Sequence, residues 1–244
     1  MKKTYADLHL RINLKESEKV SRIITKASRL GYHLTAIPFT QNTTEEEIQT
    51  LKNTCNEANI DLSSRVDLKP RTPKELTYYL RRLRRKFEII SVICETKEVA
   101  RQAAKDRRVD LLNFPSFDFR RRFFDRAEAE LAHKSVAALE IDINPLLTLE
   151  GPARVRLLSS LRRETATAQK FGVPIVISSG ISDEILMRKP RELAALASLF
   201  GLNETSGIEA VSKNPLAIVK RNREKLSPKF VAPGIRIVRE GKDC

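Results

Sequence analysis

Charged side chains occupy alternate positions in three short segments whose other positions are mostly apolar. These polar positions are Asp7, His9 and Arg11; Asp61, Ser63, Arg65 and Asp67; and Glu140, Asp142 and Asn144. Successive side chains of a β-strand point to opposite faces, so each segment predicts a strand with one polar face. Carboxylates and imidazoles gathered in this way can bind a divalent cation, act as general acids and bases, or form buried ion pairs.

Short strand-like runs alternate with helical patterns along the whole chain, and no proline-rich or low-complexity linker divides them. The predicted strands are residues 5–10, 34–39, 62–68, 87–94, 109–114, 138–143, 174–178 and 207–211. The predicted helices are residues 16–30, 43–56, 96–105, 123–133, 152–171, 190–200 and 215–226, with one more opening at Pro73. Apolar residues at helical spacing support the first of these helices, which should end at Gly31.

Seven or eight strand–helix units in 244 residues predict one α/β domain with a TIM-type barrel. We place this domain at residues 1–226 and expect an extended tail, residues 227–244, to lie over it. A doubly wound open sheet is the alternative. It is less favoured because no glycine-rich phosphate loop follows the first strand.

In a barrel, the apolar face of each strand should meet the outer helices, so the polar face should point into the lumen. We therefore expect a lumenal network that includes His9 and in which arginines neutralise buried carboxylates. The arginines are Arg11 and Arg65, and the carboxylates are Asp7, Glu140 and Asp142. A metal site is the alternative, but the arginines would repel a cation.

The composition indicates a polyanionic partner, because 45 Lys and Arg face 31 Asp and Glu, a net charge of +14. A thermophile's surface ion-pair network is the alternative, but paired charges would leave the net charge near zero. Nucleic acid is therefore the favoured ligand. No single-strand recognition motif is present, so we expect contacts to backbone and shape rather than base reading.

Three basic clusters are candidates for RNA contact. One lies on the helix opened by Pro73, one within residues 117–124 (Phe-Asp-Phe-Arg-Arg-Arg-Phe-Phe), and one follows the third strand. The last two should share the rim formed by the carboxyl ends of the strands. Phenylalanines among arginines can stack on bases, or equally can pack into the body. The predicted RNA-binding residues are Arg65, Lys69, Arg71, Arg81, Arg82, Arg85, Arg120, Arg121 and Arg122. Arg107, Arg108, Arg162 and Arg163 are weaker candidates.

The three cysteines, Cys55, Cys94 and Cys244, are scattered and lack the spacing of zinc ligands. No apolar run is long enough for a membrane span, and the start has no secretory pattern. We therefore expect a cytoplasmic protein with reduced thiols.

Four segments resemble the ribonuclease P component 3 family of archaea, whose fold is related to the PHP phosphoesterases. They are residues 5–10 (Tyr-Ala-Asp-Leu-His-Leu), 139–147, 175–180 and 212–215. PHP enzymes carry two histidine metal ligands, His-x-His, on the first strand, whereas this chain has His9-Leu10-Arg11. The other histidines, His33 and His133, form no pair with ligand spacing. The resemblance thus implies a PHP-like barrel without its metal.

The resemblance also implies a function. Proteins of this family are non-catalytic subunits of ribonuclease P, the endoribonuclease that matures the 5′ end of tRNA. Its RNA performs the cleavage with Mg²⁺, so the chain itself would bind no cofactor. The expected partners are that RNA, the component 2 protein in a two-by-two assembly, and precursor tRNA through the complex.

Two other functions remain open. A PHP-type phosphoesterase would use Asp7, His9, Glu140 and Asp142. A general basic RNA-binding scaffold would need no defined complex. Stoichiometric metal with turnover of a phosphoester would indicate the first, and failure to associate with component 2 would indicate the second.

Overall fold

Seven parallel strands form the centre of the computed structural model, which describes residues 3–232 and 235–238. They are β1 (Ala6–Asp7), β2 (Leu34–Phe39), β3 (Asp61–Leu68), β4 (Ile89–Ile93), β5 (Leu111–Asn113), β6 (Ala138–Asp142) and β7 (Ile175–Ser178). Each strand pairs with the next along the chain. A bridge between Leu10 and Ile181 joins the last strand to the first. The hydrogen bond from Gly180 N–H to the His9 carbonyl, 2.9 Å, belongs to the same junction. The predicted TIM-type barrel is confirmed.

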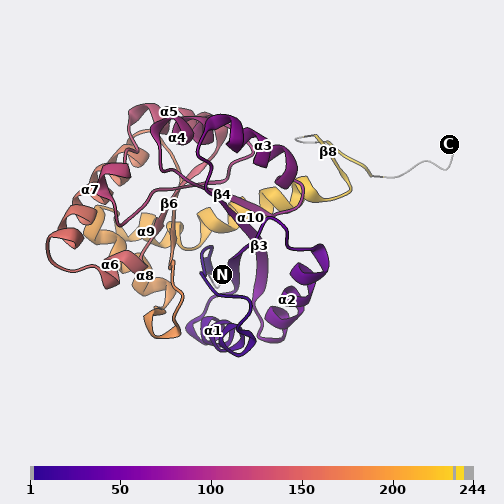
Figure 1. Cartoon of the computed structure of the whole chain (residues 1–244). Helices are drawn as coiled ribbons and strands as arrows, with labels where there is room; N and C mark the ends of the chain where they lie inside the picture. The colour runs from indigo at the N-terminus through magenta and orange to yellow at the C-terminus, as the bar shows by residue number, and fades with distance from the viewer. Residues whose placement is uncertain (1–2, 233–234, 239–244) are drawn as a thin grey trace.

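Helices surround this barrel (Figure 1). They are α1 (Ser17–Leu30), α2 (Glu45–Glu57), α3 (Pro73–Leu83), α4 (Lys97–Lys105), α5 (Arg126–Ser135), α6 (Asn144–Thr148), α7 (Gly151–Lys170), α8 (Pro190–Leu196), α9 (Glu204–Ala210) and α10 (Lys213–Leu226), with short 3₁₀ turns at Phe119–Arg121, Glu184–Leu186 and Ala197–Phe200. Side chains of Thr44, Thr72 and Thr96 cap α2, α3 and α4. Gly31 ends α1 with φ of 94°, a left-handed conformation that glycine adopts without strain.

The eighth strand, predicted at 207–211, is wrong. Residues Glu204–Ala210 form α9, whose first turn is capped by the Asn203 side chain accepting from Ser206 N–H at 2.8 Å. The buried positions Gly207 and Ala210 lie three residues apart, which is helical spacing. Only Val211 contributes to the barrel, where its carbonyl accepts from Ala6 N–H at 3.0 Å.

Helix α10 crosses the foot of the barrel, which is the end formed by the amino ends of the strands. Its Asn214 side chain donates to the Ile175 carbonyl, and its Asn222 side chain donates to the Glu88 carbonyl, both at 2.8 Å. Ile175 begins β7 and Glu88 directly precedes β4. Figure 1 shows the helix passing behind the strands from the side of α9 to the side of α3. The foot is therefore closed.

The lumen has an apolar layer at the foot and a polar layer above it. Ile218 and Val219 of α10 pack in a single cluster with apolar side chains from the strands. These side chains are Ala6, Leu8, Leu34, Ala36, Ile89, Leu111, Ala138 and Val176. The outer faces of the strands pack against the surrounding helices in a second, larger core.

The predicted tail begins where α10 ends. Its described part contains β8 (Phe230–Ala232) and β9 (Ile235–Arg236), which pair antiparallel. Figure 1 shows this pair beyond the end of α10. Cys244 lies outside the described residues, whereas Cys55 and Cys94 are buried free thiols. In the described part of the chain, no helix combines the length and apolarity that a membrane span requires.

Candidate nucleic-acid interface and the polar centre of the barrel

Arg65 of β3 is the centre of the polar layer in the lumen. Its side chain is 0% exposed, and its two terminal nitrogens donate to the two Glu140 oxygens at 2.5 and 2.7 Å. Its Nε donates to Asp67 at 2.6 Å, and Nη1 also donates to the Leu8 carbonyl at 2.6 Å. A buried charge is tolerated only when paired and hydrogen-bonded, and this bidentate geometry meets both conditions.

Glu140 is held by further donors as well as by Arg65. Ser178 donates to it at 2.8 Å, Asn113 at 3.0 Å and Ser91 at 3.3 Å. These three residues were not predicted as part of the site. Polar and apolar residues alternate less clearly in β4, β5 and β7, which carry these three residues. Each of the three nevertheless lies at a position whose side chain faces the lumen. Both Glu140 oxygens are therefore fully engaged by protein donors.

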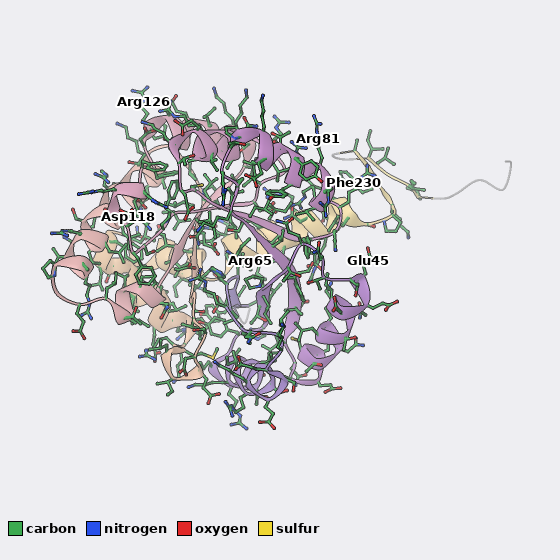
Figure 2. All side chains as sticks on the ribbon, viewed as in Figure 1. Glu45, Arg65, Arg81, Asp118, Arg126 and Phe230 are labelled. Carbon is green, nitrogen blue, oxygen red and sulfur yellow. The ribbon has the colours of Figure 1, made fainter. Side chains whose placement is uncertain are left out.

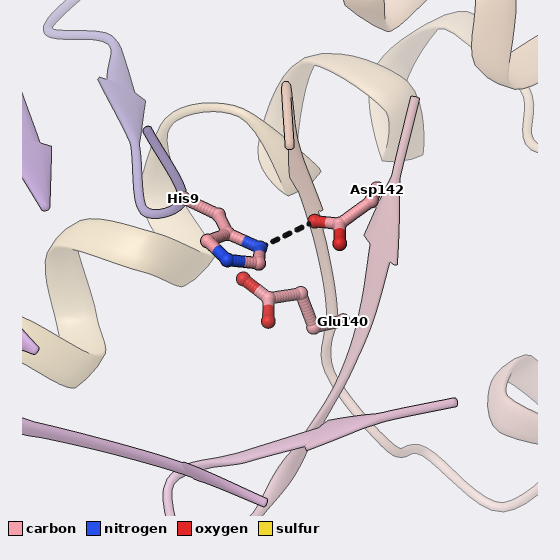
Figure 3. Close-up of side chains that lie close together, drawn as sticks. All are labelled: His9, Glu140 and Asp142. Atoms are coloured by element: carbon pink, nitrogen blue, oxygen red, sulfur yellow. Dashed lines mark hydrogen bonds and ion pairs between the residues drawn. The ribbon is translucent and has the colours of Figure 1, made fainter. Parts of the chain in front are cut away.

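His9 lies between the carboxylates of Asp142 and Asp67. Figure 3 shows its contact with Asp142 and the nearby Glu140. Its Nδ1 is 2.8 Å from Asp142 Oδ1, and its Nε2 is 3.1 Å from Asp67 Oδ2. The Nε2 contact is an ion pair without hydrogen-bond alignment. Burial and the Arg65 charge act to lower the pKa of His9, but Asp142 and Asp67 outweigh them and raise it to about 10. His9 is therefore an imidazolium at neutral pH.

The two flanking carboxylates stay ionised. Burial alone would raise the pKa of Asp67, but Arg65 and His9 hold it well below its usual range. Burial likewise opposes the lowered pKa of Asp142, which the His9 charge and hydrogen bond bring about. The polar layer is thus a set of compensating charges.

Two members of the expected network are placed differently. Asp7 is buried, but its Oδ1 accepts from the backbone N–H groups of His9 at 3.1 Å and Ser179 at 3.0 Å. Burial raises the pKa of Asp7. Arg11 is exposed, so the prediction that it lies inside the lumen is wrong, although its charge helps to lower the pKa of the buried Asp142. Ala6 and Leu8 both belong to the apolar lumenal cluster, so the apolar face of this segment turns inward, opposite to the prediction.

A metal ion does not fit the residues at this centre. His9, Glu140 and Asp142 each place a potential ligand atom within 4.8 Å of the others. However, Arg65 occupies both Glu140 oxygens, and a metal ligand requires neutral imidazole, whereas His9 is protonated. The Arg65 charge would also oppose a cation there.

The rim of the barrel carries exposed cations from two of the predicted clusters. Lys69 is 62% exposed and lies 2.8 Å from Glu95, which Arg121 also approaches at 3.5 Å. This shared carboxylate shows that the cluster after β3 and the cluster after β5 meet on one surface. Arg71 and Arg120 are exposed as well. We call Lys69, Arg71, Arg120 and Arg121 the rim cluster.

Two predicted RNA-binding residues are unavailable for this role. Arg65 is enclosed in the lumen. Arg122 is 4% exposed and donates to both oxygens of Glu164 in α7, at 3.0 and 2.5 Å, and to the Phe114 carbonyl at 2.9 Å. Both guanidinium groups neutralise buried carboxylates, so releasing them to bind RNA would leave Glu140 or Glu164 unpaired.

The phenylalanines of residues 117–124 divide between the two roles considered for them. Phe124 is buried, and its ring lies 5.9 Å from that of Phe114. Phe123 meets the same ring edge-on at 5.8 Å. Phe117 is 71% exposed at the rim and is available for base stacking.

The third cluster lies apart from the rim. Arg81, Arg82 and Arg85 are exposed at the end of α3, where the chain approaches the foot before entering β4. Figure 2 shows Arg81 and Asp118, which neighbours the rim arginines in sequence, on well-separated parts of the molecule. The basic residues thus form two surfaces rather than one.

Comparisons with known proteins agree with this architecture. The family model described as RNase P subunit p30 matches residues 4–227. The ribonuclease P protein component 3 of Methanosarcina barkeri is 32% identical over 222 residues, which cover 91% of this chain and 90% of that protein. The protein of the same name from Methanosarcina acetivorans is 33% identical over 178 residues, 73% of either chain.

A solved structure supports the fold. One chain of a cryo-EM structure of archaeal ribonuclease P with mature tRNA has a TM-score of 0.84 and 21% identity, covering 98% of this chain and 100% of its own. At 21% identity, this similarity supports the fold alone. The family model and the relatives extend over nearly the whole barrel. The chain therefore belongs to the RNase P subunit p30 family.

Proposed function

We propose that this chain assists the catalytic RNA of ribonuclease P in removing the 5′ leader of precursor tRNA, without a catalytic centre of its own. Family membership supports its place as a protein subunit of that enzyme. The observation that carries the non-catalytic role is the bidentate Arg65–Glu140 pair. It fills the only part of the described structure where His and carboxylate ligands converge.

The RNA is contacted through cationic surfaces of the barrel. The rim cluster supplies exposed positive charge from two segments, and Phe117 adds an aromatic face beside it. Lysine and arginine side chains of this kind neutralise backbone phosphates and position the protein without reading sequence. Mg²⁺ serves the RNA, and the chain itself binds no cofactor.

The protein partner in this proposal is component 2, in an assembly of two copies of each chain. The family relationship is its support. Precursor tRNA is bound through the complex. The two described cysteines are buried free thiols, as suits the reducing cytoplasm in which we place the complex.

Reconstituted cleavage tests the proposal. Precursor tRNA is incubated with ribonuclease P RNA and component 2 at limiting Mg²⁺, with and without this chain. The chain is also incubated with substrate alone. We expect 5′ cleavage to rise sharply only when RNA, component 2 and this chain are together. Cleavage by the chain alone, or no change in the mixture, would refute the proposal.

A further inference from the structure

Helix α10 brings cations from three segments to one edge of the foot. Arg84, at the end of α3, and Arg221, on α10, both bind the Asp110 carboxylate, at 2.5 and 2.9 Å. Arg84 also donates to the carbonyl of Arg108, in the turn between α4 and β5, at 3.3 Å. The end of α3, this turn and α10 therefore meet around Asp110. Lys225 follows Arg221 by one helical turn, on the same side of α10.

The acidic residues at this edge are already neutralised. Asp110 has two arginine partners, and Glu88 is paired with Lys52 at 2.5 Å and Arg223 at 2.8 Å. Asp106 holds Arg108 through two oxygens, with distances of 2.9 and 2.7 Å. These pairs occupy the Asp110, Glu88 and Asp106 carboxylates, so none of the three balances a further cation.

The exposed cations at this edge include four without a carboxylate ion pair in the described part of the chain. They are Arg81 from α3, Arg85 from the turn after α3, Arg107 from the turn before β5, and Lys225 from α10. We call these four residues the foot cluster. Partial burial, together with Arg221, Arg84 and Arg107, lowers the pKa of Lys225. Like charges held this close repel one another, and a bound anion would relieve that repulsion.

We propose that the foot cluster binds backbone phosphates of RNA, as a second contact surface at the opposite end of the barrel from the rim. Arg107 and Lys225 form its centre, and Arg81 and Arg85 continue it along α3. The proposal rests on the proposed function in that it takes the ligand to be ribonuclease P RNA. Functional sites of TIM-type barrels are normally built at the carboxyl ends of the strands. Here the basic helix α10 closes the foot and thereby places cations at that end of the barrel as well.

The spread of the cations favours RNA over an acidic peptide. They come from three separate segments and form an edge rather than a single pocket. A nucleic-acid backbone offers regularly repeated charges to such an edge, and arginine and lysine are its usual contacts. Arg84 and Arg221 hold the underlying Asp110 and fix the three segments relative to one another.

The test is the salt dependence of binding between the full-length chain and ribonuclease P RNA. The variant is Arg107→Ala/Lys225→Ala, which removes two exposed side chains that form no ion pair in the described part of the chain and should leave the fold intact. A matched control, Arg163→Ala/Lys170→Ala, removes two exposed cations from α7, across the barrel from α3 (Figure 1). Both variants have the same net charge, so only the position of the lost charges differs.

We expect the foot variant to flatten the plot of log K against log salt by about 1.8 if it contacts duplex, or about 1.4 for single strand. The control should change the slope less, because Arg163 is only a weaker candidate for RNA contact and Lys170 was not a candidate. An Arg107→Lys/Lys225→Arg variant keeps both charges and should bind like the original chain. An unchanged slope in the foot variant, or an equal change in both alanine variants, would overturn the proposal. If the original chain itself neither bound the RNA nor stimulated cleavage, the proposed function would fail instead.

Discussion

At the scale of single residues, Arg65 decides what the centre of the barrel can do. It neutralises Glu140 and Asp67 simultaneously. In the described part of the chain, no other arginine forms an ion pair with either carboxylate. A histidine–carboxylate cluster that would otherwise attract a cation is thereby converted into an internal support. The His9 imidazolium completes the arrangement by joining Asp67 to Asp142.

Loss of the Arg65 charge should be strongly destabilising. Arg65→Met leaves Glu140 and Asp67 buried without their partner, so we expect the free energy of unfolding to fall by about 3–5 kcal/mol. Arg126→Ala is the control, because its ion pair with Glu130 is on the surface and contributes little to stability. Urea unfolding of the two variants measures both changes. Equal losses would contradict the network.

The same network should make stability depend on pH. The pKa of His9 is about 10 in the folded chain, against 6.5 for an unperturbed histidine, so the folded state binds the extra proton. The stabilisation is complete below pH 6.5 and is lost as the pH rises through 10. Its slope is about 1.4 kcal/mol per pH unit within that window.

Urea unfolding between pH 6.5 and 10 measures this dependence. His9→Gln keeps a polar side chain but cannot titrate, so its stability should change less over the same interval. Lysines, tyrosines and cysteines titrate equally in both proteins and cancel in the comparison. Parallel curves would mean that His9 is not the titrating group.

At the scale of elements, one short segment can carry residues with opposite roles. Arg120, Arg121 and Arg122 are consecutive, yet Arg122 turns inward to Glu164 while the first two are exposed. Three identical residues in a row give no periodic signal, so the sequence does not distinguish them. The short 3₁₀ turn at Phe119–Arg121 ends directly before Arg122 and so determines that this side chain, rather than its neighbours, faces α7.

The arginines of this segment should therefore behave differently. Arg120→Ala/Arg121→Ala should flatten the salt dependence of RNA binding by about 1.8 for duplex or 1.4 for single strand, with stability nearly unchanged. Arg122→Ala should instead cost about 3–5 kcal/mol of unfolding free energy, because Glu164 is left buried and alone. Filter binding across a salt series and urea unfolding separate the two effects. A stable Arg122→Ala variant would contradict the assigned ion pair.

At the scale of the whole molecule, the alternation of strands and helices was enough to predict the barrel. It was not enough to count the strands, because residues 207–211 are too few to show their period and Asn203 begins a helix instead. The position of α10 across the foot could not be predicted from the sequence either, because its residue pattern predicts a helix but not the surface that the helix covers. For the same reason the sequence did not show that the α3 cations and Lys225 share the foot.

The site was predictable where strand alternation is strict and not where a strand bends. Glu140 and Asp142 face the lumen as their spacing in β6 predicts. In the first strand Ala6 and Leu8 face the lumen, while Asp7 accepts from backbone N–H groups and Arg11 is exposed. Arg65 was predicted both as a lumenal neutraliser and as an RNA contact, and only its burial decides between the two.

We propose that the polar centre supports the fold and takes no part in cleavage. Single-turnover cleavage of precursor tRNA tests this, using ribonuclease P reconstituted with an Asp142→Asn variant of this chain, which keeps the side-chain shape. Thermal unfolding and assembly of the variant provide the control for folding. We predict a cleavage rate within about twofold of the original enzyme at saturating protein, because a structural contact has no differential effect on the transition state. A rate lowered by about a hundredfold or more, in a folded and assembled variant, would contradict the account and return the barrel centre to the catalytic machinery.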